Sequence, residues 1–252
     1  MTGGAGFIGS AVVRELLANT DCCVVNVDCL TYAGNLATLS DIAESKNYIF
    51  EQMNICDAHS VRRLFQKHNP TGVIHLAAES HVDRSIDSAD DFVQTNIIGT
   101  YTLLEAVRTH HLEQGRSSGS GCRFLHVSTD EVFGSLGTGG LFSEQSPYEP
   151  NSPYSASKAS ADHLVRAWGE TYDLNTSISN CSNNYGPYQY PEKLVPVVID
   201  KAMAREPIPV YGAGENVRDW LYVDDHARAL TKILFDGRPG RRYNIGGNSE
   251  KR

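Results

Sequence analysis

Two carboxyl side chains, Asp130 and Glu131, follow an apolar segment in the middle of the chain, and a Tyr154-x-x-x-Lys158 pair lies further along. A tyrosine and a lysine beside a nicotinamide suit hydride transfer at a carbinol carbon. Two adjacent carboxyls suit a different task, because one can take up a proton while the other gives one to a departing hydroxyl group. The combination predicts an enzyme that removes water from its substrate and uses a transient redox step to do so.

Each pair also has an ordinary structural interpretation. Tyrosine and lysine four residues apart lie on one face of a helix and often form a plain surface pair. Two acids after a strand commonly cap a helix or lie in a solvated turn. Their joint position, on the side where α/β sheets bind ligands, favours the chemical interpretation. His75, on an apolar strand, is predicted instead to be a core histidine with satisfied hydrogen bonds.

A glycine-rich segment at the start of the chain predicts a dinucleotide site. The residues from Thr2 to Gly9 carry G-x-G-x-x-G spacing, which lets a pyrophosphate approach the N-terminus of the next helix. A plain glycine turn is the alternative, but Asp28 ends the next strand at the position where a carboxylate accepts from a ribose 2′-hydroxyl group. Because a carboxylate repels a 2′-phosphate, we predict NAD rather than NADP.

Charge and composition favour a small-molecule ligand. The chain has 252 residues, a net charge of −8 and 40% hydrophobic residues, enough for one large core or a domain and a half. Nucleic acids and anionic membranes are bound by clustered Lys and Arg, so the acidic balance argues against both. The sequence contains no long apolar run and no signal-type start, and we therefore expect a cytoplasmic protein.

The six cysteines match the spacing of neither a disulfide set nor a metal site. Cys22 and Cys23 are adjacent, C-x-x-C spacing does not occur, and the histidines do not recur at ligand spacing. We therefore predict reduced, mostly buried thiols and no metal site.

Strand-like and helix-like segments alternate along the chain and predict a doubly wound α/β fold with a parallel sheet. The composition of 115–121 is typical of a flexible surface loop, and the prolines before Tyr154 are expected to fix the start of its helix. Predicted strands are 23–27, 48–51, 72–76, 124–128, 176–180, 208–211 and 242–245, and predicted helices are 8–18, 58–68, 90–111, 154–172, 192–204 and 223–235.

The start of the chain departs from the expected pattern. A glycine motif of this kind follows a strand, yet only Met1 and Thr2 precede it. A central strand without its first residues would leave its neighbours unpaired. We therefore expect a chain that is shortened at its start.

Seven segments together resemble the nucleotide-sugar branch of the extended short-chain dehydrogenase/reductase family, and within it the 4,6-dehydratases. The resemblance implies an NAD-binding Rossmann domain over 1–180 and a smaller nucleotide-sugar-binding region over 181–252, incomplete here, with some elements returning to the Rossmann sheet. It also implies a homodimer. The segments are TGGAGFIGSA from Thr2, DCLTYAGN from Asp28, HLAAESHVDRSI from His75, STDEVFG from Ser128, SPYSASKAS from Ser152, NCSNNYGPYQYPEKL from Asn180 and VRDWLYVDDHARAL from Val217.

The resemblance implies dTDP-glucose as substrate and assigns five catalytic residues. Tyr154 would take the proton of the sugar 4-hydroxyl group while C4 gives hydride to NAD, and Lys158 would lower the tyrosine pKa and hold the nicotinamide ribose. Glu131 would remove the C5 proton, Asp130 would protonate the departing C6 hydroxyl group, and Thr129 would bond the 4-keto oxygen. NAD is regenerated in each turnover and is expected to stay tightly bound.

Contacts to the two ligands are implied in the same way. Substrate contacts are Ser80, Thr129, Asn183, Lys193, Leu194, Pro209, Tyr211 and Arg218, of which Lys193 and Arg218 suit a diphosphate. Cofactor contacts are Gly3, Gly6, Phe7, Ile8, Gly9, Asp28, Leu30, Thr31, Asn54, Ile55, Leu76, Ala77, Ala78, Thr95, Tyr154, Lys158 and Asn184.

The sequence departs from the family pattern in places. Asn54 stands where the family has Asp near the adenine, and its amide oxygen can still accept a hydrogen bond. Phe133 replaces a usual Tyr, and the chain ends at Arg252 inside a segment that runs on in the family. Other interpretations stay open: an epimerase or decarboxylase of another nucleotide sugar, a uridine nucleotide in place of thymidine, or an NAD-binding module without turnover.

Overall fold

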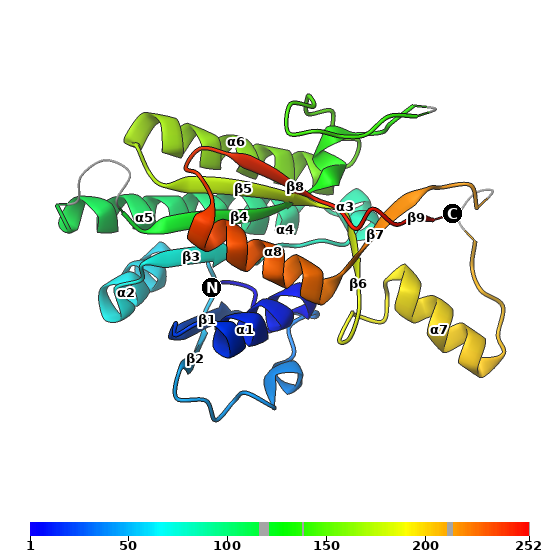
Figure 1. The fold of residues 1–252 in the computed structure, drawn as a ribbon, viewed down its shortest axis with the longest axis horizontal. Helices are drawn as coiled ribbons and strands as arrows, with labels where there is room; N and C mark the ends of the chain where they lie inside the picture. The colour runs from blue at the N-terminus through cyan, green and yellow to red at the C-terminus, as the bar shows by residue number, and fades with distance from the viewer. Residues whose placement is uncertain (116–120, 138, 211–213, 252) are drawn as a thin grey trace.

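The computed structural model describes residues 1–115, 121–137, 139–210 and 214–251 (Figure 1). A parallel β-sheet carries helices on both faces, which confirms the predicted doubly wound α/β fold. Most of the predicted loop at 115–121 lies outside these described residues, and so does Tyr211. Residues 208–210 form no strand, so that prediction is wrong for them; Ile208 and Val210 are exposed, and no sheet covers their apolar run.

The main sheet brings the carboxyl ends of its strands to one edge. Its parallel pairs join β1 to β2, β3 to β4, β4 to β5 and β5 to β8. The strands β4 and β5 are buried almost throughout, although the β5 sequence, TSISNC, is mostly polar. The bounds are β1 (Val24–Asp28), β2 (Tyr48–Gln52), β3 (Gly72–His75), β4 (Arg123–Thr129), β5 (Thr176–Cys181) and β8 (Arg242–Ile245).

A gap one strand wide separates β1 from β3. Thr2 forms parallel bridges to Val27 on one side and His75 on the other. Beyond Met1, the gap continues as a cavity of about 380 Å³ lined by apolar side chains that include Leu16, Val24, Val73 and Leu103. The α-ammonium group of Met1 donates to Val25 O at 2.7 Å. Thr2 therefore joins the two parts of the sheet at the edge where the carboxyl ends lie.

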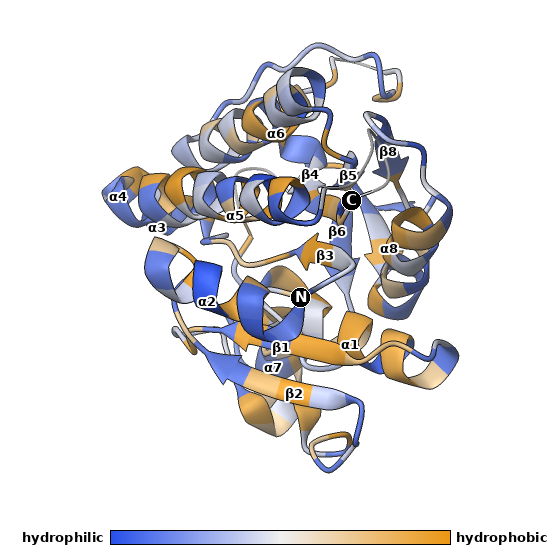
Figure 2. Cartoon of the chain, turned by 90° about the vertical axis from the view of Figure 1, so that its left-hand side faces the viewer, coloured by the Kyte–Doolittle hydropathy of each residue, from blue (hydrophilic) through white to orange (hydrophobic). Residues whose placement is uncertain are grey.

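Two helical layers cover the sheet (Figure 1). Figure 2 shows hydrophobic residues on β1, on β3 and on helices beside them. Two large apolar clusters form, one on each face, and a third, smaller cluster contains Val132, Phe133 and Ala159. One face carries α1 (Phe7–Asn19) and α8 (Val223–Asp236), and the other carries α2 (Ala58–His68), α5 (Thr100–Glu113) and α6 (Pro153–Tyr172).

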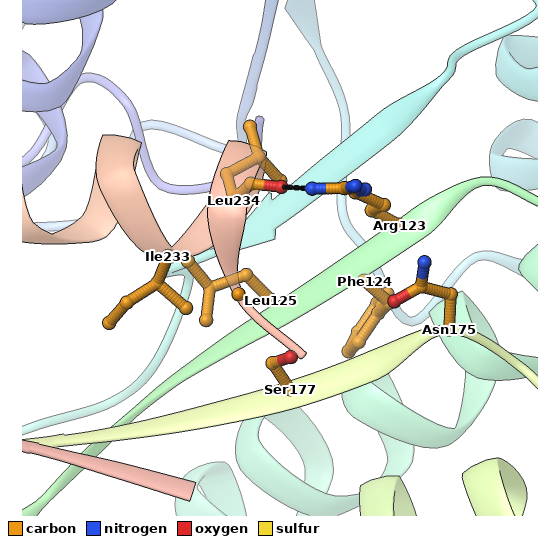
Figure 3. Close-up of a pocket in the computed structure, with 8 residues that line it drawn as sticks. Arg123, Phe124, Leu125, Asn175, Ser177, Ile233 and Leu234 are labelled. Atoms are coloured by element: carbon orange, nitrogen blue, oxygen red, sulfur yellow. Dashed lines mark hydrogen bonds between the residues drawn. The ribbon is translucent and has the colours of Figure 1, made fainter. Parts of the chain in front are cut away.

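The helix starts follow local chemistry. Ser152 caps α6 in a reciprocal pair with Ser155, and Pro153 occupies the first turn, as expected for a residue with a fixed φ. Asp57 caps α2 through bonds from two backbone N–H groups. At the far end of α8, Arg123 Nη1 donates to Leu234 O at 2.6 Å. Figure 3 shows the pocket beside this bond, which holds only about 10 Å³ and is too small for a ligand.

One predicted helix is interrupted. Residues 90–111 were expected to form a single helix, but the chain runs through α4 (Asp90–Phe92), a π-helical segment η2 (Val93–Gly99) and then α5. The wider π turn places Asn96 in the interior, where its side chain bonds Glu79 and Ser157. These tertiary bonds explain why the 3.6-residue pattern was misleading, and π turns often occur beside functional sites.

Shorter elements complete the fold. A small second sheet, in the order β6-β7-β9, was not predicted, because its strands are short and mostly polar. The helix α7 stands away from the main body in Figure 1 and has no buried residue. The bounds are η1 (Leu36–Leu39), α3 (Val82–Asp87), η3 (Asp130–Phe133), β6 (Asn183–Tyr185), α7 (Leu194–Ala204), β7 (Arg218–Tyr222) and β9 (Glu250–Lys251).

Smaller expectations have mixed outcomes. His75 is buried and bonds Thr2 Oγ1 at 2.8 Å and Thr100 Oγ1 at 2.9 Å, which confirms it as a satisfied core histidine. The thiols are not mostly buried: Cys122 and Cys181 are, but the other four reach solvent to some degree. Across the described ranges, every helix is too short or too polar to traverse a lipid bilayer.

Candidate active site

The glycine-rich loop leaves space in front of α1. Gly3 has φ +73°, and a Cβ there would lie 2.6 Å from Ala77 N, so this position requires glycine for internal reasons. Gly6 differs, because its φ is −82° and Gly3 O, at 3.4 Å, is the only described atom near a Cβ. The missing side chain of Gly6 therefore keeps the first N–H groups of α1 open. These residues fit a dinucleotide pyrophosphate.

Asp28 ties this loop to the end of β1. Its Oδ2 accepts from Ala5 N at 3.0 Å, and its Oδ1 accepts from Leu30 N at 2.9 Å. Leu30 has φ 56°, a left-handed conformation that this bond helps to hold. Each carboxylate oxygen keeps a second acceptor site, so Asp28 can still bind a ribose hydroxyl group.

We expect NAD to bind more tightly than NADP because of Asp28. Repulsion between its carboxylate and a 2′-phosphate is worth up to about 4 kcal/mol near a protein surface, so a Kd ratio on the order of 100 or more is expected. Isothermal titration of both cofactors would measure the ratio, and Asp28→Asn should narrow it while keeping one acceptor for the loop. Equal Kd values in the unaltered protein would contradict the prediction.

Tyr154 and Lys158 lie inside the protein, so the interpretation as a surface pair is wrong. Tyr154 is 9% exposed and Lys158 is 3% exposed, both on the face of α6 that packs on the sheet. Lys158 Nζ donates to Val127 O of β4 at 2.9 Å, and Tyr154 N donates to Ser85 Oγ at 3.2 Å. These bonds fix the helix turn that carries both side chains against the end of β4.

The two acids follow directly at that strand end. Thr129 is the last residue of β4, and its Oγ1 accepts from Glu131 N at 3.2 Å, which starts the short helix η3. The charges of Asp130 and Glu131 both act on Tyr154. The structure therefore brings together Thr129, Asp130, Glu131, Tyr154 and Lys158.

The surroundings shift how these groups titrate. Burial raises the pKa of Asp130 to about 6, with opposing effects from a Thr129 hydrogen bond and from Arg218. The pKa of Glu131 is also raised, by burial and by the charge of Asp130, although part of the residue reaches solvent. Burial lowers the pKa of Lys158 to about 8 and raises that of Tyr154. A carboxyl that stays partly protonated near neutrality suits a general acid.

We expect Asp130→Asn to raise the melting temperature above pH 6. Because the folded pKa of Asp130 lies above its unfolded value, ionising this group destabilises the fold as pH rises from about 4 to about 6. The asparagine amide has no charge to bury. The gain in the free energy of unfolding should therefore be absent near pH 3.5 and should reach its full value, roughly 1–3 kcal/mol, above pH 6. Thermal melts across this pH range would test it. A constant difference at all pH values would contradict the titration argument.

The comparisons with known proteins agree with this chemistry. A family model described as GDP-mannose 4,6 dehydratase matches residues 1–252. A dTDP-glucose 4,6-dehydratase of Neisseria meningitidis serogroup B is 58% identical over 252 residues, which are 100% of this chain and 71% of the relative. The chain belongs to the dTDP-glucose 4,6-dehydratase family.

Solved structures agree with the family assignment. The dTDP-glucose 4,6-dehydratase from Streptomyces venezuelae, solved with NAD bound, is 45% identical with a TM-score of 0.92 and covers 99% of this chain and 76% of that one. A UDP-glucose 4-epimerase from Thermotoga maritima shares the fold at 31% identity, with a TM-score of 0.87, and covers 99% of this chain and 77% of that one. The fold alone therefore does not separate the dehydratase family from epimerases.

The cofactor contacts that the dehydratase family implies follow the carboxyl ends of successive strands. Asn54 and Ile55 follow β2, Leu76 to Ala78 follow β3, and Thr95 lies on η2. Two of these side chains already have partners: Asn54 Oδ1 accepts from Cys56 N at 2.9 Å, and Asn184 Oδ1 lies 2.8 Å from His226 Nδ1. The remaining members of the set are Gly3, Gly6, Phe7, Ile8, Gly9, Asp28, Leu30 and Thr31 on the glycine loop, on α1 and at or after the end of β1, and Tyr154 and Lys158 on α6.

The substrate contacts are brought together less completely. Lys193 Nζ donates to Ser80 O at 3.2 Å, and its charge acts on Glu131, as that of Arg218 acts on Asp130. Asn183 begins β6. Leu194, Pro209 and Arg218 are exposed, and Tyr211 lies outside the described residues.

Asn96 is a site residue that sequence reasoning missed. Its Nδ2 donates to Ser157 Oγ at 2.9 Å and to Glu79 O at 3.0 Å, and its Oδ1 accepts from Glu79 N at 2.9 Å. The amide thereby joins the segment after β3 to the helix of Tyr154. The only available signal was a polar residue within an apolar helical stretch.

Proposed function

We propose that this protein is an NAD-dependent hydro-lyase that converts dTDP-glucose into dTDP-4-keto-6-deoxy-glucose, a precursor of deoxysugars such as rhamnose. The observation that carries the proposal is the adjacent acid pair beside a buried Tyr154 and Lys158, with the pKa of Asp130 raised to about 6. The NAD-bound relative at 45% identity supports the cofactor.

The first half of the reaction would use the Tyr154 phenol. When bound, NAD would accept hydride from C4 of the sugar and return it at C6. Tyr154 would take the 4-hydroxyl proton. Burial and the charges of Glu131 and Asp130 raise the pKa of Tyr154, and the positive charge of Lys158 would act in the opposite direction. Thr129, at the end of β4, would donate its hydroxyl hydrogen to the 4-keto oxygen.

The second half would use the two acids. A 4-keto group acidifies the C5 proton, and Glu131 would remove it and give it back to C5 when hydride returns to C6. Asp130 would give its proton to the C6 hydroxyl group, which leaves as water. Lys193 and Arg218 would bind the diphosphate, because both are cations whose charges reach the acid pair.

An epimerase also needs the tyrosine and lysine, but it has no task for an acid pair. Asp130 and Glu131 therefore favour the dehydratase over the epimerase that shares the fold. The deciding experiment is to incubate the protein with NAD and dTDP-glucose and to identify the product by NMR. A 4-keto-6-deoxy sugar supports the proposal, and an epimerised sugar that keeps its C6 hydroxyl group refutes it.

We also propose a homodimer formed through α5 and α6. Both helices expose large side chains on neighbouring surfaces, among them Tyr101, Leu112 and Tyr172, and such surfaces suit paired helices. A cytoplasmic location stays a prediction from the sequence.

A further inference from the structure

A buried carboxylate lies one helical turn beyond Lys158. The side chain of Asp162 is 0% exposed, a rare state for an unpaired aspartate. Three donors hold its Oδ2: Tyr148 OH at 2.5 Å, Ser128 Oγ at 2.9 Å and Asn180 Nδ2 at 3.4 Å. They come from a loop, from β4 and from β5, so three parts of the fold fix one carboxylate that has no role in the proposed reaction.

His126 lies between this carboxylate and Lys158. Its Nε2 is 3.2 Å from Asp162 Oδ1 and 3.4 Å from Lys158 Nζ, and its side chain is 0% exposed. Among the described residues, His126 Nδ1 and Asp162 Oδ1 have no hydrogen-bond partner. Burial and the charge of Lys158 lower the pKa of His126 to about 4, so the ring is neutral.

The buried group of Asp162, His126 and Lys158 then holds one negative and one positive charge. Burial would raise the pKa of Asp162, but the side chains of His126, Lys158 and Tyr148 together outweigh burial and lower that pKa. With His126 neutral, Asp162 is the buried negative charge and Lys158 the buried positive one. A buried ammonium group without a counter-charge tends to lose its proton.

We propose that Asp162 is a positioning residue whose buried negative charge keeps Lys158 protonated across the neutral ring of His126. The inference rests on the proposed function only for the role that Lys158 has in the proposed reaction. Other charged and titratable groups of the network are His75 on β3, Cys181 on β5, Asp130 and Glu131 on η3, Tyr154 on α6, and, around Tyr148, His163 on α6 and Arg242 on β8.

Lysine NMR measures the proposed effect directly. With ¹³Cε-labelled lysine, the Lys158 signal can be titrated in the unaltered protein and in Asp162→Asn. We expect the pKa of Lys158 to fall by about one unit or more in the variant, because its main favourable charge is removed. Asp236→Asn is a matched control, since it removes an exposed carboxylate that pairs with Lys232 on α8, and it should leave Lys158 unchanged. An unchanged pKa in folded Asp162→Asn overturns the proposal.

Stability gives a second test if Asp162→Asn folds poorly. Asp162→Asn leaves the ammonium group of Lys158 buried and unpaired, so adding Lys158→Met should restore part of the lost melting temperature. Additive losses in the double variant overturn the proposal. Both tests are independent of turnover. A protein that lacks dehydratase activity but shows the Lys158 shift would refute the proposed function and leave this inference intact.

Discussion

Replacing both acids, with Asp130→Asn and Glu131→Gln, is expected to stop water loss while the first hydride transfer continues. Removing a general acid or base typically costs ~10²- to 10⁴-fold in rate, or about 3–5 kcal/mol of barrier. Tyr154 and Lys158 are unchanged, so NADH should build up on the enzyme after dTDP-glucose is added. The absorbance of NADH would show this accumulation, while the rate at which the 4-keto-6-deoxy product forms should fall by the factor given above.

Two comparisons make that result specific. Tyr154→Phe should abolish the NADH signal, because the 4-hydroxyl proton then has no acceptor in place. Asp224→Asn with Asp225→Asn removes another adjacent acid pair, which is exposed in the first turn of α8, and should leave turnover near the unaltered value. Normal turnover in the variant lacking Asp130 and Glu131 would instead indicate an epimerase-like site.

Much of the scaffold was predictable because apolar and β-branched residues form short runs in β1, β3 and β4, whereas β5 is fully buried but mostly polar. The helix α2 and the strand β8 lie at the predicted residues, and the other strands of the main sheet differ by one residue at one or both ends. The glycine loop and Asp28 were predictable as well, since backbone geometry and charge leave few residue choices there.

The polar interior could not be predicted in the same way. Asn96 and Asp162 acquire their environments only when β3, β4, β5 and α6 come together. Asp162 reads in sequence as an ordinary helix-surface acid, because the donors that surround it lie 14 to 34 residues away. The small sheet was missed for a different reason: β6 has only three residues, and the short run Trp220–Tyr222 in β7 continues directly into α8.

We expect an extension of three or four β-branched residues before Met1 to stabilise the protein. The cavity of about 380 Å³ between β1 and β3 has apolar walls, and an added parallel strand would bond both neighbours. Burial of each apolar side chain contributes about 1.5–3 kcal/mol against about 1–2 kcal/mol for ordering its backbone. The extension also replaces a buried ammonium group, whose pKa burial lowers to about 6, by an uncharged amide.

A net gain of about 2 kcal/mol corresponds to a melting temperature higher by roughly 4–8 °C for a chain of this size. The matched control is a Gly-Ser extension of equal length, which supplies the same amide but no side chains for Leu16, Val24, Val73 and Leu103 to contact. Calorimetry should therefore place the β-branched variant above both the control and the unaltered protein. If the two extended variants had the same melting temperature, the apolar walls of the gap would not be a binding surface for a strand. Any rise in melting temperature would then come from the loss of the buried charge alone.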